Sequence, residues 1–171
     1  ALGAFEDEDM EAIMDYVEEN YRISQFVLFG YSCGATASII TAAKHPEKIV
    51  AVIADSPFAN LIKAPGGNIG KILWAVFCNY WGWFKTGINL YKETNALAVV
   101  DKVAGIMFIH GKNDKTLSYS NSLELYRRAQ EPKELWLIEG IDHVQALRFN
   151  PEKYFRKTLQ FIQICLELRG P

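Results

Sequence analysis

A serine between two glycines separates an apolar run from a segment of small residues. Gly30-Tyr31-Ser32-Cys33-Gly34 has the pattern G-x-S-x-G and follows the apolar run 25–30. A nucleophile on a strand-to-helix turn needs glycines two positions before and after it, because the turn is too tight for side chains. Such a turn exposes the serine hydroxyl and aims the next backbone N–H toward a developing oxyanion. The pattern predicts Ser32 as a nucleophile and the backbone amide of Cys33 as an oxyanion donor.

A serine nucleophile needs a base, and the base needs an acid that orients it. The chain offers three histidines as the base. His143 lies in a loop after the last predicted strand, at the edge where Ser32 is expected. His45 stands at a helix end and His110 inside an apolar run, so we interpret these two as structural residues. His143 is therefore the predicted base.

The acid is predicted from the same edge of the sheet. Asp114 ends the segment Gly-Lys-Asn-Asp that directly follows the third predicted strand, and its alternative interpretation is a turn or cap residue. Asp55, at the end of the second strand, is the second candidate. Asp142 adjoins His143, and neighbouring side chains diverge, so we interpret it as loop structure. Ser32, Asp114 and His143 each follow a strand of one parallel sheet, which predicts that they meet.

Helical and buried-strand patterns alternate along the chain, which is typical of a parallel α/β sheet with both faces covered. The hydrophobic periodicity predicts the last helix at 151–168, with Phe155, Leu159, Ile162 and Leu166 as its buried stripe. The predicted strands are 25–30, 49–55, 104–111 and 134–140, and the other predicted helices are 5–20, 33–44 and 120–130.

Residues 56–100 interrupt this alternation and carry many aromatic side chains. We expect a helical, lid-like insertion that rests on the sheet and begins with the loop-forming run 64–68. An aromatic lid favours an apolar acyl or aromatic group in the substrate. Tyr31, Trp81 and Trp83 are the predicted substrate-binding residues. Alternatively, the rings only pack the insertion onto the sheet, or they contact a membrane surface or a protein partner.

The composition indicates one globular domain over residues 1–171. Half of the residues are hydrophobic and 22% are charged. Eight of the twenty acids lie between Glu6 and Glu19, which we interpret as the solvated face of a helix rather than a docking surface. The scattered bases and a pI near 6 exclude a nucleic-acid partner. The longest apolar stretch, 72–84, is too short to span a membrane.

The three cysteines, Cys33, Cys78 and Cys165, are too widely spaced for a disulfide framework or a metal cluster. Reduced thiols favour a cytoplasmic protein, and we expect neither a metal nor another cofactor. The chain does not begin with Met, so a targeting signal cannot be judged from it.

Three segments resemble the α/β-hydrolase fold superfamily: G-Y-S-C-G around Ser32, H-G-K-N-D ending at Asp114 and E-G-I-D-H ending at His143. A-D-S-P-F-A at 54–59 resembles its serine-aminopeptidase-like and monoglyceride-lipase-like branch. The resemblance implies the C-terminal portion of a three-layer fold with four parallel strands. It also implies a serine hydrolase that cleaves an ester, thioester or amide of a small-molecule, acyl or peptide substrate, with Ser32 as nucleophile, His143 as base and Asp114 as acid.

The chain departs from this superfamily at its start. Members carry several strands before the segment that begins here, and a loop among them supplies the second oxyanion donor. Without such strands, the strand at 25–30 is expected to be an open edge. We expect a longer chain, a second copy or another partner to cover it. The alternative function is a catalytically idle scaffold or interaction subunit with an α/β-hydrolase-like fold.

Overall fold

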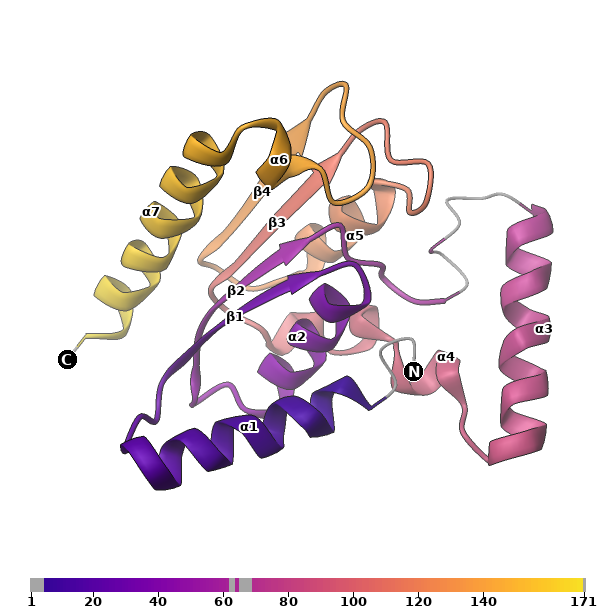
Figure 1. Ribbon diagram of the computed structural model, residues 1–171, viewed down its shortest axis with the longest axis horizontal. Coiled ribbons are helices and arrows are strands. Elements are labelled where there is room, and N and C mark those ends of the chain that lie inside the picture. Colours follow the sequence, from indigo (N-terminus) through magenta and orange to yellow (C-terminus); the bar gives the residue numbers. More distant parts are fainter. Residues whose placement is uncertain (1–4, 62–63, 65–68, 171) are drawn as a thin grey trace.

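The computed structural model describes residues 5–61, 64 and 69–170, and four of its segments form one parallel sheet. The strands are β1 (Phe26–Tyr31), β2 (Ile49–Asp55), β3 (Ile106–Gly111) and β4 (Lys133–Ile138), in this spatial order. Because every neighbouring pair of strands is parallel, all four strands end at one edge of the sheet (Figure 1). The predicted α/β fold with four parallel strands is confirmed.

Helices cover both faces of the sheet. On one face pack α1 (Glu6–Tyr21), α2 (Cys33–Lys44) and α5 (Ser120–Arg128), and on the other α6 (Ala146–Phe149) and α7 (Pro151–Arg169) (Figure 1). Every residue of β2 and β3 is buried, as a continuous apolar run between two helical layers requires. The three layers hold the central strands rigidly, and with them the loops at their C-terminal ends.

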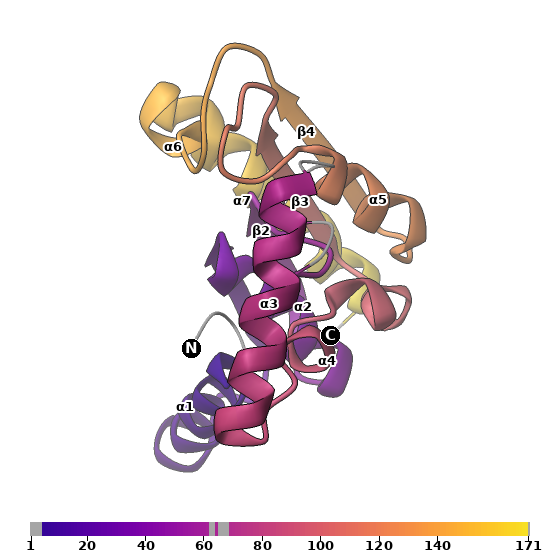
Figure 2. The same cartoon turned by 90° about the vertical axis from the view of Figure 1, so that its right-hand side faces the viewer.

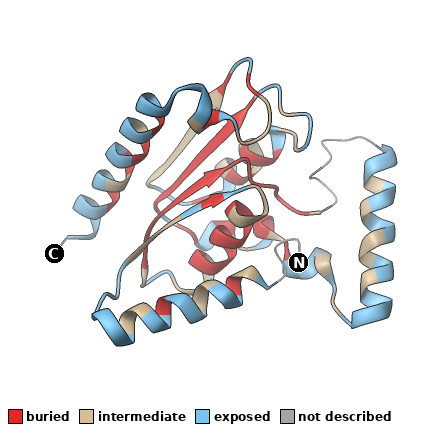
Figure 3. Ribbon diagram, viewed as in Figure 1, coloured by how far each residue is buried: buried red, intermediate tan, exposed pale blue. Residues whose placement is uncertain are grey.

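The sheet ends at β1 among the described residues. β1 pairs with β2 alone, and its other long side is unpaired in this part of the chain. Phe29 on β1 is 46% exposed, and Ile13 and Tyr21 on α1 are also exposed. Figure 3 shows exposed residues along both elements. An unpaired strand edge beside exposed apolar side chains is the arrangement expected from the sequence.

The buried stripe of α7 differs from the prediction by one residue. Phe155, Leu159 and Leu166 are exposed. Both stripes repeat with the period of a helix, so periodicity alone does not choose between neighbouring faces. The choice is made by the sheet, because the ring of Tyr154 meets that of Trp136 on β4 at 6.4 Å between centroids. The residues that α7 buries are Tyr154, Thr158, Phe161 and Cys165.

The insertion is helical, as expected, and its two ends pack into the core beside the sheet, but its long helix does not rest on the sheet. It consists of α3 (Ile69–Thr86), α4 (Leu90–Glu93) and the 3-10 turns η1 (Ala96–Ala98) and η2 (Val100–Lys102). α3 stands apart from the sheet and buries none of its described residues (Figures 1 and 2).

The rings of α3 pair along their own helix instead. Trp74 and Phe77 lie 5.8 Å apart between centroids, and Phe77 and Trp81 lie 6.3 Å apart. Positions three and four residues apart share one side of a helix, so such rings can contact each other without a sheet. The expectation that this insertion packs onto the sheet is therefore wrong for α3. Of the predicted loop 64–68, residues 65–68 lie outside the described part of the chain.

Candidate active site

Ser32 lies in the tight turn between β1 and α2. Its φ of 54° and ψ of −120° form a strained conformation for a residue with a side chain. Its backbone N–H donates to the carbonyl of Asp55 at 2.9 Å, which ties the turn to the end of β2. Cys33 follows as the first residue of α2, where a backbone N–H has no acceptor within the helix. The role of this N–H as an oxyanion donor stays a prediction.

Only one of the two glycines around Ser32 is required by close packing. A Cβ on Gly30 would lie 2.4 Å from the carbonyl oxygen of Gly34 and 2.5 Å from Ala35. At Gly34 the described structure has nothing within 4 Å of an added Cβ. The expectation that both positions must be glycine is thus supported at Gly30 and wrong at Gly34, because Gly34 already lies on the open first turn of α2.

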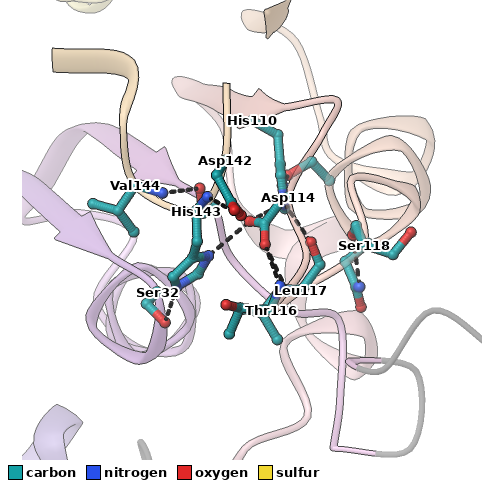
Figure 4. Close-up of polar contacts among 12 residues, drawn as sticks. Ser32, His110, Asp114, Thr116, Leu117, Ser118, Asp142, His143 and Val144 are labelled. Carbon is teal, nitrogen blue, oxygen red and sulfur yellow. Dashed lines mark hydrogen bonds and ion pairs between the residues drawn. The ribbon is translucent and has the colours of Figure 1, made fainter. Parts of the chain in front are cut away.

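The structure brings Ser32, His143 and Asp114 together in one chain of contacts (Figure 4). Nε2 of His143 lies 3.0 Å from Oγ of Ser32, and Nδ1 lies 2.7 Å from Oδ2 of Asp114. A ring nitrogen that faces a carboxylate carries the proton, which leaves Nε2 as an acceptor for the Ser32 hydroxyl. The side chain of Asp114 is fully buried and that of His143 is 20% exposed.

The Asp114 carboxylate accepts hydrogen bonds on both oxygens. Oδ1 accepts from the backbone N–H groups of Thr116 and Leu117, each at 2.8 Å, and Oδ2 accepts from His143 and His110. Burial raises the pKa of Asp114, but the hydrogen bonds from His110, the Leu117 amide, His143 and the Thr116 amide outweigh it and lower the pKa to about 2. Asp114 is therefore a permanent anion at neutral pH.

His110 is the part of this network that sequence reasoning missed. We interpreted it as a packed, hydrogen-bonded residue, and it is fully buried, with Nδ1 2.7 Å from Oγ of Ser122. Its Nε2, however, lies 3.1 Å from Oδ2 of Asp114 and 3.2 Å from the carbonyl of Leu117. Two acceptors around Nε2 require a proton there. The available signal was the spacing of four residues between His110 and Asp114 across the strand end.

Two contacts hold the loop of His143 against the loop of Asp114. A Cβ on Gly111 would lie 2.4 Å from the carbonyl oxygen of Ile141, so only glycine allows this approach. Oδ1 of Asp142 accepts from the backbone N–H of Lys115 at 2.9 Å and from that of His143 at 2.8 Å. Asp142 thus joins the two loops.

A second anchor reaches the His143 loop from the end of β2. The hydroxyl of Ser56 donates to Oδ1 of Asp55 at 2.9 Å and accepts from the backbone N–H of Val144 at 3.3 Å. Ser56 and Val144 both have positive φ, 54° and 52°. Asp55, the second candidate acid, is buried and supports the turn after His143 through Ser56. Burial raises the pKa of Asp55 to about 6, although the Ser56 hydrogen bond and the charges of His110 and His143 oppose the rise.

A cavity of about 260 Å³ lies beside Ser32. Trp81 and Trp83 are not among the described residues that line it; they lie on α3 and are 53% and 52% exposed. Tyr31 ends β1 directly before Ser32 and is exposed. The substrate-binding role of these three residues stays a prediction. The described residues that line the cavity are Ser32, Cys33, Phe58, Leu61, Ala64, Thr116 and Leu117.

Two further expectations concern metals and membranes. Within residues 5–61, 64 and 69–170, no group of three or more His, Cys, Asp or Glu side chains is arranged to hold a metal ion. None of the helices described here has the length and apolar character needed to cross a membrane. Cys33, Cys78 and Cys165 are free thiols.

Comparisons with known proteins agree on the family and the fold. The sequence profile of the prolyl oligopeptidase family matches residues 1–169. The uncharacterized protein YqkD of Bacillus subtilis is 26% identical over 169 residues, which are 94% of this chain and 55% of that protein. The human alpha/beta hydrolase domain-containing protein 17B is 24% identical over 160 residues, 90% of this chain and 48% of that protein. The chain thus spans about half the length of the curated relatives it matches.

Solved structures share this architecture. The Pyrococcus furiosus esterase Pf2001 superposes with a TM-score of 0.71 at 22% identity, over 95% of this chain and 63% of the esterase. A monoacylglycerol lipase of Paleococcus ferrophilus superposes with a TM-score of 0.69 at 18% identity, over 94% of this chain and 76% of the lipase. These likenesses show the fold. Together with the family profile over residues 1–169 and the curated relatives, they confirm the α/β-hydrolase superfamily. The narrower branch suggested by residues 54–59 stays a prediction.

Proposed function

The chain belongs to the prolyl oligopeptidase family, and from this premise we propose that it is a serine hydrolase that works through an acyl-enzyme on Ser32. Its substrate would be an ester, thioester or amide. The observation that carries the proposal is the chain of contacts from Ser32 Oγ to His143 Nε2, at 3.0 Å, and from His143 Nδ1 to Asp114, at 2.7 Å. This geometry matches a nucleophile, a base and an orienting acid.

In the first half of the reaction, Ser32 Oγ attacks the carbonyl carbon of the substrate while His143 Nε2 takes the hydroxyl proton. The negative charge that develops on the carbonyl oxygen would be stabilised by the backbone N–H of Cys33. His143 then returns the proton to the leaving group as the bond breaks, which leaves an ester between Ser32 and the acyl group.

In the second half, a water molecule gives its proton to His143 and attacks the acyl ester, and His143 returns the proton to Ser32. Asp114 holds the Nδ1 proton throughout and stabilises the imidazolium that forms in each step. Because the pKa of Asp114 is lowered to about 2, it remains ionised and takes no proton itself. The donors around this buried carboxylate therefore support the proposed role.

Labelling of the full-length native protein with a fluorophosphonate probe tests the proposal. We expect one label on Ser32, found by mass spectrometry, and no label in Ser32→Ala. Ser120→Ala, which changes an exposed serine at the start of α5, is the matched control and should keep the label. A folded protein that is never labelled, and that is recovered in a stable complex, would support the idle scaffold instead.

A further inference from the structure

The cavity beside Ser32 has a wall that is fixed to the helix of the nucleophile. Phe58 lines it, and both backbone polar groups of Phe58 bind the side chain of Thr36 on α2. Its N–H donates to Thr36 Oγ1 at 3.1 Å, and its carbonyl accepts from the same hydroxyl at 3.2 Å. Thr36 and Phe58 are both buried, so these hydrogen bonds are shielded from water. The wall therefore keeps its position relative to Ser32.

A second part of the wall is fixed to the acid of the site. Leu117 lines the cavity, and its backbone N–H donates to Oδ1 of Asp114 at 2.8 Å. Its carbonyl lies 3.2 Å from Nε2 of His110, on the same buried network. Asn121 braces the loop after β2, because its Oδ1 accepts from the backbone N–H of Ala59 at 3.0 Å. The cavity is thus built before any substrate arrives.

The described residues that line the cavity offer no charged side chain as a partner. Apart from the hydroxyls of Ser32 and Thr116, the described lining side chains end in carbon or in the thiol of Cys33. A charged or strongly polar group would lose its water there without gaining hydrogen bonds, which is unfavourable. A dry apolar cavity of about 150 Å³ holds a benzene ring, so 260 Å³ has room for about ten carbon atoms.

We infer that this cavity binds the acyl part of the substrate and selects an uncharged, apolar acyl chain of medium length. The inference rests on the proposed function, since it takes Ser32 as the atom that receives the acyl group. Atoms balance as in any acyl transfer: the carbonyl carbon bonds to Ser32 Oγ, the leaving group departs with the proton from His143, and water releases the fatty acid.

A series of p-nitrophenyl esters from acetyl to dodecanoyl tests the inference on the full-length native protein. Each methylene that enters the cavity should raise kcat/KM by about fourfold, as expected from the burial of one methylene group. The rise should stop near eight to ten carbons, where the cavity is full. If kcat/KM is flat along the series, or if prolyl p-nitroanilides are cleaved and medium-chain esters are not, the inference is overturned.

Two substitutions of Leu61 should change the chain-length preference in opposite directions. Leu61→Ala enlarges the cavity and should move the optimum to longer chains, and Leu61→Phe should move it to shorter ones. The preference is measured as the ratio of kcat/KM for the octanoyl ester to kcat/KM for the acetyl ester. This ratio does not depend on the amount of folded enzyme. Leu73→Ala, on the exposed side of α3, is the control and should keep the native ratio.

The results also separate this inference from the proposed function. If Ser32 is labelled and acetyl ester is hydrolysed without any dependence on chain length, the acyl cavity is wrong and the serine hydrolase stands. If Ser32 is not labelled and no ester is hydrolysed, both are wrong. Opposite shifts in the two Leu61 variants support both, because misfolding cannot produce them.

Discussion

Nε2 of His110 lies 3.1 Å from Oδ2 of Asp114, the carboxylate oxygen that also binds His143. The side chains of His110 and Asp114 are both fully buried. A buried carboxylate that accepts from two imidazoles and two backbone amides is held both in charge state and in orientation. His110 is therefore a positioning residue for Asp114, which in turn orients His143.

We expect His110→Leu to raise the pKa of Asp114, and His110→Gln, whose amide can still donate, to raise it less. Because the pKa of Asp114 is lower in the folded than in the unfolded protein, the ionised carboxylate adds to the free energy of unfolding at pH values above 3.8. This addition is lost as the pH falls toward about 2. The free energy of unfolding should therefore rise most between pH 2 and pH 5 in the wild type, less in His110→Gln and least in His110→Leu. Urea unfolding at pH 2 and pH 5 measures this rise in each protein.

A general loss of packing in these variants would lower the free energy of unfolding equally at pH 2 and pH 5. An unchanged difference between the two pH values would therefore contradict the role of His110. The rate of Ser32 labelling should fall in the same order as the pH-dependent gain.

The glycines around Ser32 provide a matched pair of substitutions. In Gly30→Ala the new methyl group would overlap the backbone of Gly34 and Ala35, and overpacking of this kind destabilises by about 1–3 kcal/mol or more. We expect Gly34→Ala to fold and to be slightly more stable, by up to about 1 kcal/mol, because alanine favours a helix. Thermal unfolding and Ser32 labelling check both variants. Equal stability and labelling of Gly30→Ala and Gly34→Ala would refute the difference between the two positions.

The placement of Ser32, Asp114 and His143 could be predicted because it follows from topology. Each residue follows a strand, and parallel strands end at one edge. The orientation of α7 could not be predicted in this way. Its two candidate stripes have the same period, and only the surface it meets, including Trp136, decides which one is buried.

Side-chain partners from distant segments could not be predicted from the sequence either, because they depend on which surfaces meet in the fold. His110 is indistinguishable from a core residue until Asp114, Ser122 and the Leu117 carbonyl are seen around it. α3 carries enough apolar residues to predict burial, yet its rings contact one another along the helix. Composition predicts that a side chain avoids water, but not which neighbour covers it.

Asp55 gives an opposite pH dependence. Burial raises its pKa from 3.8 to about 6, so in this window the folded chain keeps a proton that the unfolded chain has released. Stability therefore falls as the pH rises from 4 to 6, and the difference of about 2 pKa units corresponds to up to about 3 kcal/mol at pH 7. Asp55→Asn should raise the free energy of unfolding at pH 7 and change it little at pH 4. Equal changes at both values in urea unfolding would show that the charge is not the cause.

Val144 places strain next to the predicted base. It has a φ of 52°, a conformation unfavourable for a β-branched residue, and its N–H donates to the hydroxyl of the equally strained Ser56. Such strain amounts to about 1–3 kcal/mol and persists only where surrounding contacts hold it. We interpret it as the result of fixing His143 between Ser32 and Asp114.

Val144→Gly should therefore separate stability from activity. Glycine adopts positive φ without strain, which offsets the entropy it adds to the unfolded chain, so the free energy of unfolding should stay level or rise by up to about 1 kcal/mol. The rate of Ser32 labelling should fall, because the turn that carries His143 is no longer restrained. Ser56→Ala should lower both, since it leaves the half-buried N–H of Val144 without the Ser56 hydroxyl, at a cost of up to about 1 kcal/mol. A Val144→Gly protein that loses stability together with labelling would mean that the valine packs well and stores no strain.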